Sequence, residues 1–134
     1  MRDIIISAIP EATIKEKAGI VIVEGNYSIA KNRFITYKLL INPKDDGYYP
    51  LEALIKTSFR LPFESDGFRK EIVEIYQAST TPYNLSDFTE EKIILQWEKR
   101  LNPLELFDFI QKFYKNIQLL DKIALKHTPR LDNH

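Results

Sequence analysis

The segment from Asn42 to Glu52, NPKDDGYYPLE, gathers the residues of this 134-residue chain that most resemble a metal-binding or catalytic loop. Its adjacent aspartates suggest a calcium loop of the EF-hand type, which places a glycine at the sixth position. With Gly47 at that position, the third residue would be the cation Lys44, and the twelfth would be Ala53, which has no side-chain oxygen. Asp45 and Asp46 alone are also a poor pair of metal ligands, because neighbouring side chains of an extended chain point in opposite directions. The segment therefore predicts a turn between two strands, formed by Asn-Pro and Asp-Gly.

Residues that commonly carry catalysis are scarce. The chain has no cysteine, which excludes disulfides, thiolate catalysis and cysteine-ligated metals. Its two histidines, His127 and His134, both lie near the C-terminus, so a histidine base or metal ligand would have to come from there. The four glycines are isolated and form neither a dinucleotide fingerprint nor a P-loop. We expect no metal and no cofactor, although a pair of carboxylates acting as acid and base stays open.

The charge pattern bears on possible partners. The chain has 19 basic and 19 acidic residues, and neither residues 1–83 nor residues 84–134 have a basic surplus. Nucleic-acid binding usually requires such a surplus, because much of its affinity comes from neutralising phosphates. The N-terminal apolar run is too short for a signal peptide or a membrane span. We expect a soluble, cytoplasmic protein that binds neither nucleic acid nor membrane.

Two adjacent tyrosines, Tyr48 and Tyr49, follow the aspartates. Two neighbouring side chains in a turn cannot both easily point into the core, so at least one is expected at the surface. Tyrosine is a common anchor of protein interfaces, because its ring is apolar and its hydroxyl forms hydrogen bonds. The pair is therefore a candidate contact surface.

The last predicted helix carries an unusually wide apolar stripe. Its central residues are Leu106, Ile110, Phe113, Ile117, Leu120 and Ala124. At about 100° per residue, these and their apolar neighbours cover roughly 200° of the helix, more than a simple surface helix needs. One interpretation places the helix between the sheet and a preceding helix. The other has the flank with Leu119 and Ile123 facing another chain, in a homodimer or in a complex with a different protein.

The elements that position these residues begin with strands. Alternation of apolar and polar residues and β-branched runs predict strands at residues 4–9, 19–24, 33–41 and 51–61, and residues 11–19 resemble one or two helical turns that Gly19 ends. Residues 68–78 are ambiguous, because their apolar residues have helical spacing while IVEIY has a high strand propensity. We favour a strand that forms a hairpin with residues 51–61 after the Asp-Gly turn; the helix stays open.

The second part of the chain predicts two helices. Asp87 and Glu90 resemble a capping box, and the apolar residues that follow have helical spacing as far as Leu101. Asn102 can cap a further helix that starts at Pro103, where the missing N–H costs nothing, and that ends near residue 126.

Together these patterns predict one α+β domain over residues 1–126, with an antiparallel meander of four or five strands followed by two C-terminal helices packed on one face, and a flexible tail at 127–134. We expect a non-enzymatic interaction or assembly module of the adaptor, chaperone or immunity type, acting through its apolar C-terminal helix on another protein chain. Tyr48, Tyr49, Leu119 and Ile123 are the candidate interaction residues. The alternative is a small-ligand-binding domain or carboxylate-dependent enzyme with its site between sheet and helices.

Overall fold

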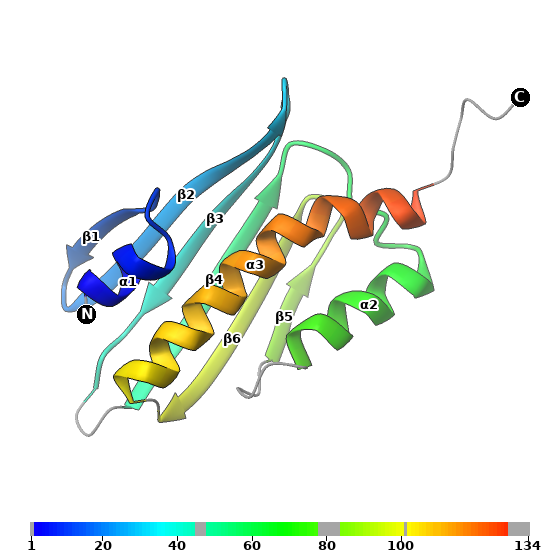
Figure 1. Cartoon of the computed structure of the whole chain (residues 1–134). Helices are drawn as coiled ribbons and strands as arrows, with labels where there is room; N and C mark the ends of the chain where they lie inside the picture. Colours follow the sequence, from blue (N-terminus) through cyan, green and yellow to red (C-terminus); the bar gives the residue numbers. More distant parts are fainter. Residues whose placement is uncertain (1, 45–47, 78–83, 101, 129–134) are drawn as a thin grey trace, which may run out of the picture.

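The computed structural model describes residues 2–44, 48–77, 84–100 and 102–128 of the chain. Within these ranges, a six-stranded antiparallel sheet carries three helices on one of its faces, and the last helix runs along the middle of the sheet (Figure 1). The predicted α+β class, with an antiparallel sheet followed by a C-terminal helix, is confirmed. The strands are β1 (Thr13–Lys17), β2 (Ile20–Ala30), β3 (Arg33–Ile41), β4 (Tyr48–Thr57), β5 (Asn84–Phe88) and β6 (Lys92–Arg100). The helices are α1 (Arg2–Ala8), α2 (Asp66–Gln77) and α3 (Pro103–His127).

The strand order in the sheet is β1-β2-β3-β4-β6-β5. The first four strands form a meander, as predicted, although β1 is not among the predicted strands; β6 then pairs with β4 and leaves β5 at the edge. The β1–β2 turn is tight because Ala18 and Gly19 both have positive φ angles, 53° and 80°, as expected of a two-residue hairpin loop. The described part of the chain thus has more strands than the four or five predicted.

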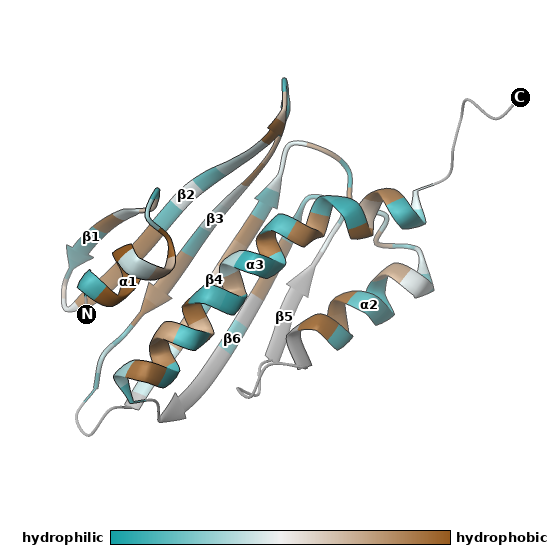
Figure 2. Ribbon diagram, in the orientation of Figure 1, coloured by the Kyte–Doolittle hydropathy of each residue, from teal (hydrophilic) through white to brown (hydrophobic). Residues whose placement is uncertain are grey.

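The core lies between the sheet and the helices. Alternate residues of β2, β3 and β4 point toward α3, because side chains of a strand alternate between its two faces. The buried residues of these three strands are Val21, Val23, Ile35, Tyr37, Leu39, Ile41, Leu51, Ala53 and Ile55. The apolar stripe of α3 supplies Leu106, Phe109, Ile110, Phe113, Ile117, Leu120 and Ala124, and the alternation of hydrophobic and hydrophilic residues along this helix is visible in Figure 2. The wide stripe is covered from more than one side, because α1 and α2 also contact α3.

The start of α3 is the element that the sequence defines most sharply. Asn102 accepts a hydrogen bond from the Glu105 backbone N–H at 2.8 Å and donates its own backbone N–H to the Glu105 carboxylate at 3.2 Å. Pro103 occupies the first turn, as predicted. The helix ends one residue later than expected, because His127 belongs to it and Thr128 is its C-cap. The remainder of the predicted tail, residues 129–134, lies outside the described residues.

The helix predicted from Asp87 to Leu101 is wrong. The described residues of this segment form β5 and β6, so a single helix, α3, follows the sheet instead of two. Ile93 is fully buried opposite Ile55 on β4, and Ile94 lies opposite Leu54. The run of apolar residues satisfies both a helical and a strand pattern, and the pairing of β6 with the free side of β4 decides between them.

The strand favoured for residues 68–78 is also wrong, and the helical alternative is correct as far as Gln77, where α2 ends; residue 78 lies outside the described residues. The Oγ of Ser65 accepts a hydrogen bond from the Phe68 backbone N–H at 3.2 Å, which satisfies one of the free donors at the start of α2. Phe68 and Ile72, four residues apart, are both buried. The helical spacing was therefore the better guide here than the strand propensity of IVEIY.

The two N-terminal elements have the opposite secondary structure to the one predicted. Residues 4–9, expected as a strand, belong mostly to α1, which buries Ile5 and Ala8. Residues 11–19, expected as helical turns, contain β1, which pairs with β2 along the edge of the sheet. Both segments are short, and their contacts with α3 and β2 determine their structure more than their own propensities do. None of the helices in the described ranges combines the length and apolar character required to cross a membrane.

Candidate interaction surface on the open face of the sheet

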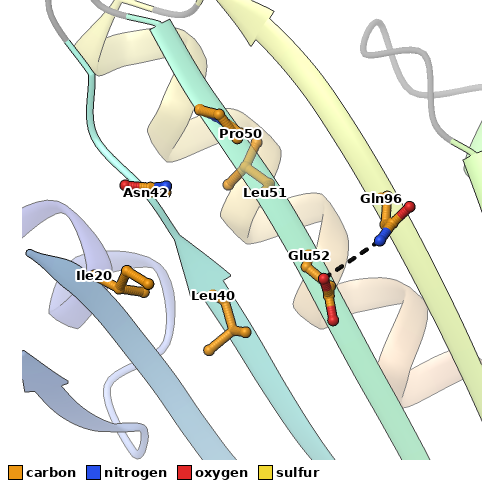
Figure 3. Close-up of a pocket in the computed structure, with 7 residues that line it drawn as sticks. All are labelled: Ile20, Leu40, Asn42, Pro50, Leu51, Glu52 and Gln96. Atoms are coloured by element: carbon orange, nitrogen blue, oxygen red, sulfur yellow. Dashed lines mark hydrogen bonds between the residues drawn. The ribbon is translucent and has the colours of Figure 1, made fainter. Parts of the chain in front are cut away.

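The sheet has one face that no described helix covers. Figure 3 views this open face, with α3 passing behind the strands. Strand alternation directs Ile22 of β2, Leu40 of β3 and Leu54 of β4 toward it, and all three side chains are half-buried. Ile22 lies directly opposite Leu40, and Leu54 lies opposite Lys38, two residues along β3 from Leu40, so that it is a diagonal neighbour of Leu40. These apolar side chains therefore form a band across the central strands.

A hollow of about 310 Å³ opens beside this band (Figure 3). It lies where β3 ends and β4 begins, and the Asn42 backbone N–H donates a hydrogen bond to the Pro50 carbonyl at 3.0 Å, which holds the two ends together. Its lining consists of Ile20, Leu40, Asn42, Pro50, Leu51, Glu52 and Gln96. The hollow thus has a mixed lining, with apolar side chains from β2, β3 and β4 and polar groups from Asn42, Glu52 and Gln96.

Glu52 is the charged group of this hollow. The Gln96 amide donates a hydrogen bond to its carboxylate at 3.4 Å, and no described cation forms an ion pair with it. Because the hollow is open to solvent, a lysine or arginine of another molecule can reach this carboxylate. A single carboxylate beside an amide favours binding of a cation over acid–base catalysis, which needs two groups in different environments.

The other side of the open face carries an ion-pair network. Lys15 of β1 lies 2.6 Å from the Glu24 carboxylate, and Lys38 of β3 lies 3.9 Å from it. The hydrogen bond from Lys15 lowers the pKa of Glu24 most; the slight burial of the carboxylate acts in the opposite direction, and the charges of Lys15 and Lys38 lower it further. Glu24 therefore stays ionised at neutral pH, and the face shows alternating charges next to its apolar band.

The four residues predicted from the sequence do not lie together on this face. Tyr48 begins β4, and its side chain is not among those described. Tyr49 is half-buried and packs against the core on the helix side of the sheet. Leu119 and Ile123 are half-buried on α3, and Ile123 contacts the core. The turn at residues 45–47 lies outside the described residues, so a contact role for these four side chains stays a prediction.

The open-face residues escaped prediction although the sequence contains a signal for them. Leu40 occupies a position of β3 that points away from the buried face of the sheet, and Leu54 occupies such a position of β4. Apolar residues on both the even-numbered and the odd-numbered positions of a strand predict a strand that is covered on both faces. With all described helices on one side, they mark instead an apolar surface on the other side.

A second polar cluster joins α2 to α3. Lys126 and His127 both contact one oxygen of the Glu71 carboxylate, at 2.6 and 2.9 Å. The hydrogen bonds from Lys126 and then from His127 lower the pKa of Glu71. A carboxylate–histidine pair can orient a general base, but here the lysine occupies the same oxygen, and the His127 ring packs against Phe68. The cluster therefore fastens the two helices together.

Within the described ranges, no group of three or more histidine, aspartate or glutamate side chains is arranged to hold a metal ion. Comparison of the chain with protein-family models, with curated proteins and with solved structures found no match.

Proposed function

We propose that this chain is a non-enzymatic protein–protein interaction module, of the adaptor, chaperone or immunity type, whose contact surface is the open face of the sheet. The observation that carries the proposal is the apolar band of Ile22, Leu40 and Leu54 on a sheet whose described helices all lie on the other face. The solvent face of an antiparallel sheet usually carries polar residues. An apolar band with a polar rim is typical of a protein interface.

The open face is a better candidate than the C-terminal helix. The apolar stripe of α3 already packs on the sheet, α1 and α2, so little of it is left for a partner. Leu104 and Leu125 remain largely exposed on this helix, at 76% and 53%, but they lie about 30 Å apart at a rise of 1.5 Å per residue. Single exposed leucines of this kind are ordinary on protein surfaces.

A ligand site between sheet and helices has less support. Of the two hollows described, one lies on the open face, and the other is lined by Leu104, Glu105, Phe107 and Asp108 at the start of α3. Neither is enclosed between the sheet and the helices. The geometry around Glu52, with apolar residues beside a carboxylate that can accept a cation, suits a protein partner better than a small metabolite.

Affinity purification from the native cell tests the proposal. The tagged chain should retain a partner, which can be a second copy of itself, and Leu40→Arg should lose it because a charge would be buried at the contact. Leu125→Arg, on the exposed end of α3, is the matched control and should retain the partner. Circular dichroism and thermal melting establish that both variants fold. A partner that survives Leu40→Arg but is lost in Leu125→Arg would place the contact on the helix and contradict the proposal.

A further inference from the structure

We infer that the partner of the open face is a second copy of this chain, bound face to face about a twofold axis that runs along the strands between β2 and β3. This inference rests on the proposed function of the open face. It is motivated by the charge pattern of the face, which is complementary to itself under that symmetry.

The first self-complementary row crosses four strands at the level of the hollow. Lys15 lies opposite Ile22, Ile22 opposite Leu40, and Leu40 opposite Glu52. The row therefore reads base, apolar, apolar, acid from β1 to β4. A twofold axis through its middle places Ile22 over Leu40 of the second copy, and Lys15 over the second copy's Glu52. The row pairs unlike charges at both ends and apolar side chains in its centre.

The adjacent row is complementary to itself in its centre, where it carries the two charges, while its ends, Thr13 and Leu54, are uncharged. Thr13 lies opposite Glu24, Glu24 opposite Lys38, and Lys38 opposite Leu54. The same axis places Glu24 over Lys38 of the second copy, so that the ion pair within each chain extends into a network of four charges. Two successive rows therefore obey one symmetry operation, as an isologous interface requires. Rotation about an axis perpendicular to the strands would instead place Lys38 over Lys38 and Glu24 over Glu24.

The distances allow these contacts. Packed sheets lie about 10 Å apart, a gap that an extended lysine and a glutamate span together. The Lys15 side chain is 62% exposed, and within one chain it pairs with Glu24 at 2.6 Å. In the dimer it exchanges that contact for the second copy's Glu52, while Lys38 of the second copy takes its place beside Glu24. The second copy's Lys15 would enter the hollow beside Glu52, which forms no ion pair with any described residue of its own chain. The hollow is thus explained as the seat of a partner lysine.

The area of the open face indicates how tightly the two copies should bind. Four strands at about 4.8 Å spacing and about seven residues at roughly 3.3 Å each give a contact of roughly 20 by 25 Å. Two such faces bury on the order of 1,000 Å², at the lower end of specific interfaces. We expect a reversible dimer whose population rises with concentration across the micromolar range.

Charge reversal and its rescue test the arrangement by sedimentation at increasing concentration. Glu52→Lys should raise the dissociation constant at least about tenfold, because it places two lysines together at both ends of the symmetric row. The double variant Lys15→Glu with Glu52→Lys restores unlike pairs between the chains. Lys15→Glu also sets two carboxylates side by side at positions 15 and 24 of one chain, so the double variant is compared with Lys15→Glu alone, and its dissociation constant should be at least about tenfold lower. Glu74→Lys, on the exposed side of α2, is the matched reversal and should leave the dimer unchanged. Thermal melting checks that each variant is folded.

Zero-length coupling of amines to carboxylates provides a second readout. Within one chain the Cα atoms of Lys15 and Glu52 lie about 14 Å apart, three strand spacings, too far for direct coupling. A Lys15–Glu52 cross-link between light and heavy isotope-labelled chains would support the twofold arrangement. Failure of the double variant to restore the dimer, or a dimer insensitive to Glu52→Lys, would overturn it. A wild-type monomer at every concentration would overturn the dimer while leaving the open face as a site for a different protein, which the Leu40→Arg purification detects separately.

Discussion

Tyr37 of β3 lies directly over the backbone of Gly25, its cross-strand neighbour on β2, and its buried hydroxyl has no hydrogen-bond partner among the described residues. The ring packs edge-on against Phe113 and Tyr114 of α3, with centroids 6.2 and 5.8 Å apart. An aromatic ring over a strand glycine replaces the packing that the missing side chain would supply. This packing buries the Tyr37 hydroxyl without a described hydrogen-bond partner, which lowers the stability of the folded state.

Gly25→Ala should destabilise the protein by about 1–3 kcal/mol, because the new Cβ would overlap the Tyr37 hydroxyl and ring atoms in a packed core. Urea denaturation measures the change. Combining it with Tyr37→Leu removes the ring that causes the overlap, so the loss caused by Gly25→Ala should be smaller in that background. Equal losses in the two backgrounds would show that Tyr37 does not restrict this position.

Tyr37→Phe should leave stability at neutral pH unchanged or raise it by up to about 1 kcal/mol, because it removes a buried hydroxyl without a partner while keeping the ring. Tyr27→Phe, on the half-buried ring that contacts Tyr114, is the control. A loss of more than about 1 kcal/mol in Tyr37→Phe would reveal a hydrogen bond to this hydroxyl.

Alkaline pH should destabilise the wild type through the same residue. Burial, and to a lesser degree the charge of Glu11, raises the pKa of Tyr37 from 10.0 to about 12. Between these values the unfolded chain has lost the phenolic proton and the folded chain still holds it, so the free energy of unfolding falls as pH rises. In Tyr37→Phe this part of the decline should be absent. Urea melts of both proteins at pH 8 and pH 11 measure the difference; parallel declines would contradict it.

Glu71→Gln should weaken the junction of α2 and α3 in a pH-dependent way. Hydrogen bonds from Lys126 and His127 hold the pKa of Glu71 below its ordinary value of 4.5, so its ionised form stabilises the folded state. That stabilisation is present above about pH 4.5 and is lost as pH falls through the lower folded pKa. The difference in melting temperature between Glu71→Gln and the wild type should therefore shrink on acidification. Glu74→Gln, on the exposed side of the same helix, should show no such trend.

Asp121→Ala should destabilise the protein by about 1–3 kcal/mol, because it leaves the half-buried Arg33 without its acceptor. Arg33 contacts the Asp121 carboxylate through Nε at 2.6 Å and through a terminal nitrogen at 2.5 Å, and its guanidinium stacks on Phe59 at 3.9 Å. Arg33→Lys retains the charge but loses the two-point contact and the stack, so it should also be destabilising. Asp108→Ala, which removes an exposed ion pair within α3, is the matched control with an expected change below about 0.5 kcal/mol.

Helices and strands whose residues stabilise one another within the same segment could be predicted from the sequence. Those whose structure depends on pairing with residues far away in the chain could not. The start of α3 follows from Asn102, Pro103 and Glu105, which satisfy each other within one turn. The alternation in β3 likewise specifies its own strand. Ile93, in contrast, belongs to a strand only because Ile55 lies opposite it, nearly forty residues earlier in the chain.

The candidate site was missed for a related reason. The prediction attached function to the unusually wide stripe of α3, and the fold uses that stripe to cover the sheet. Which face of the sheet stays open depends on where all the helices pack, and no local pattern contains that information. Leu40 and Glu52 become candidates only when the sheet is assembled around them.

The strand order has a consequence for the synthesis of the chain. β4 emerges from the ribosome before α2, but its free hydrogen-bonding edge is filled only by β6, which ends at Arg100. Until then, a strand with Leu51, Leu54 and Ile55 presents an unpaired edge while α3 has not yet covered the core face. Such an edge pairs readily with other chains. A nascent or truncated chain ending near residue 80 is therefore expected to aggregate more readily than the full chain, because the last third of the sequence supplies both the strand and the helix that protect β4.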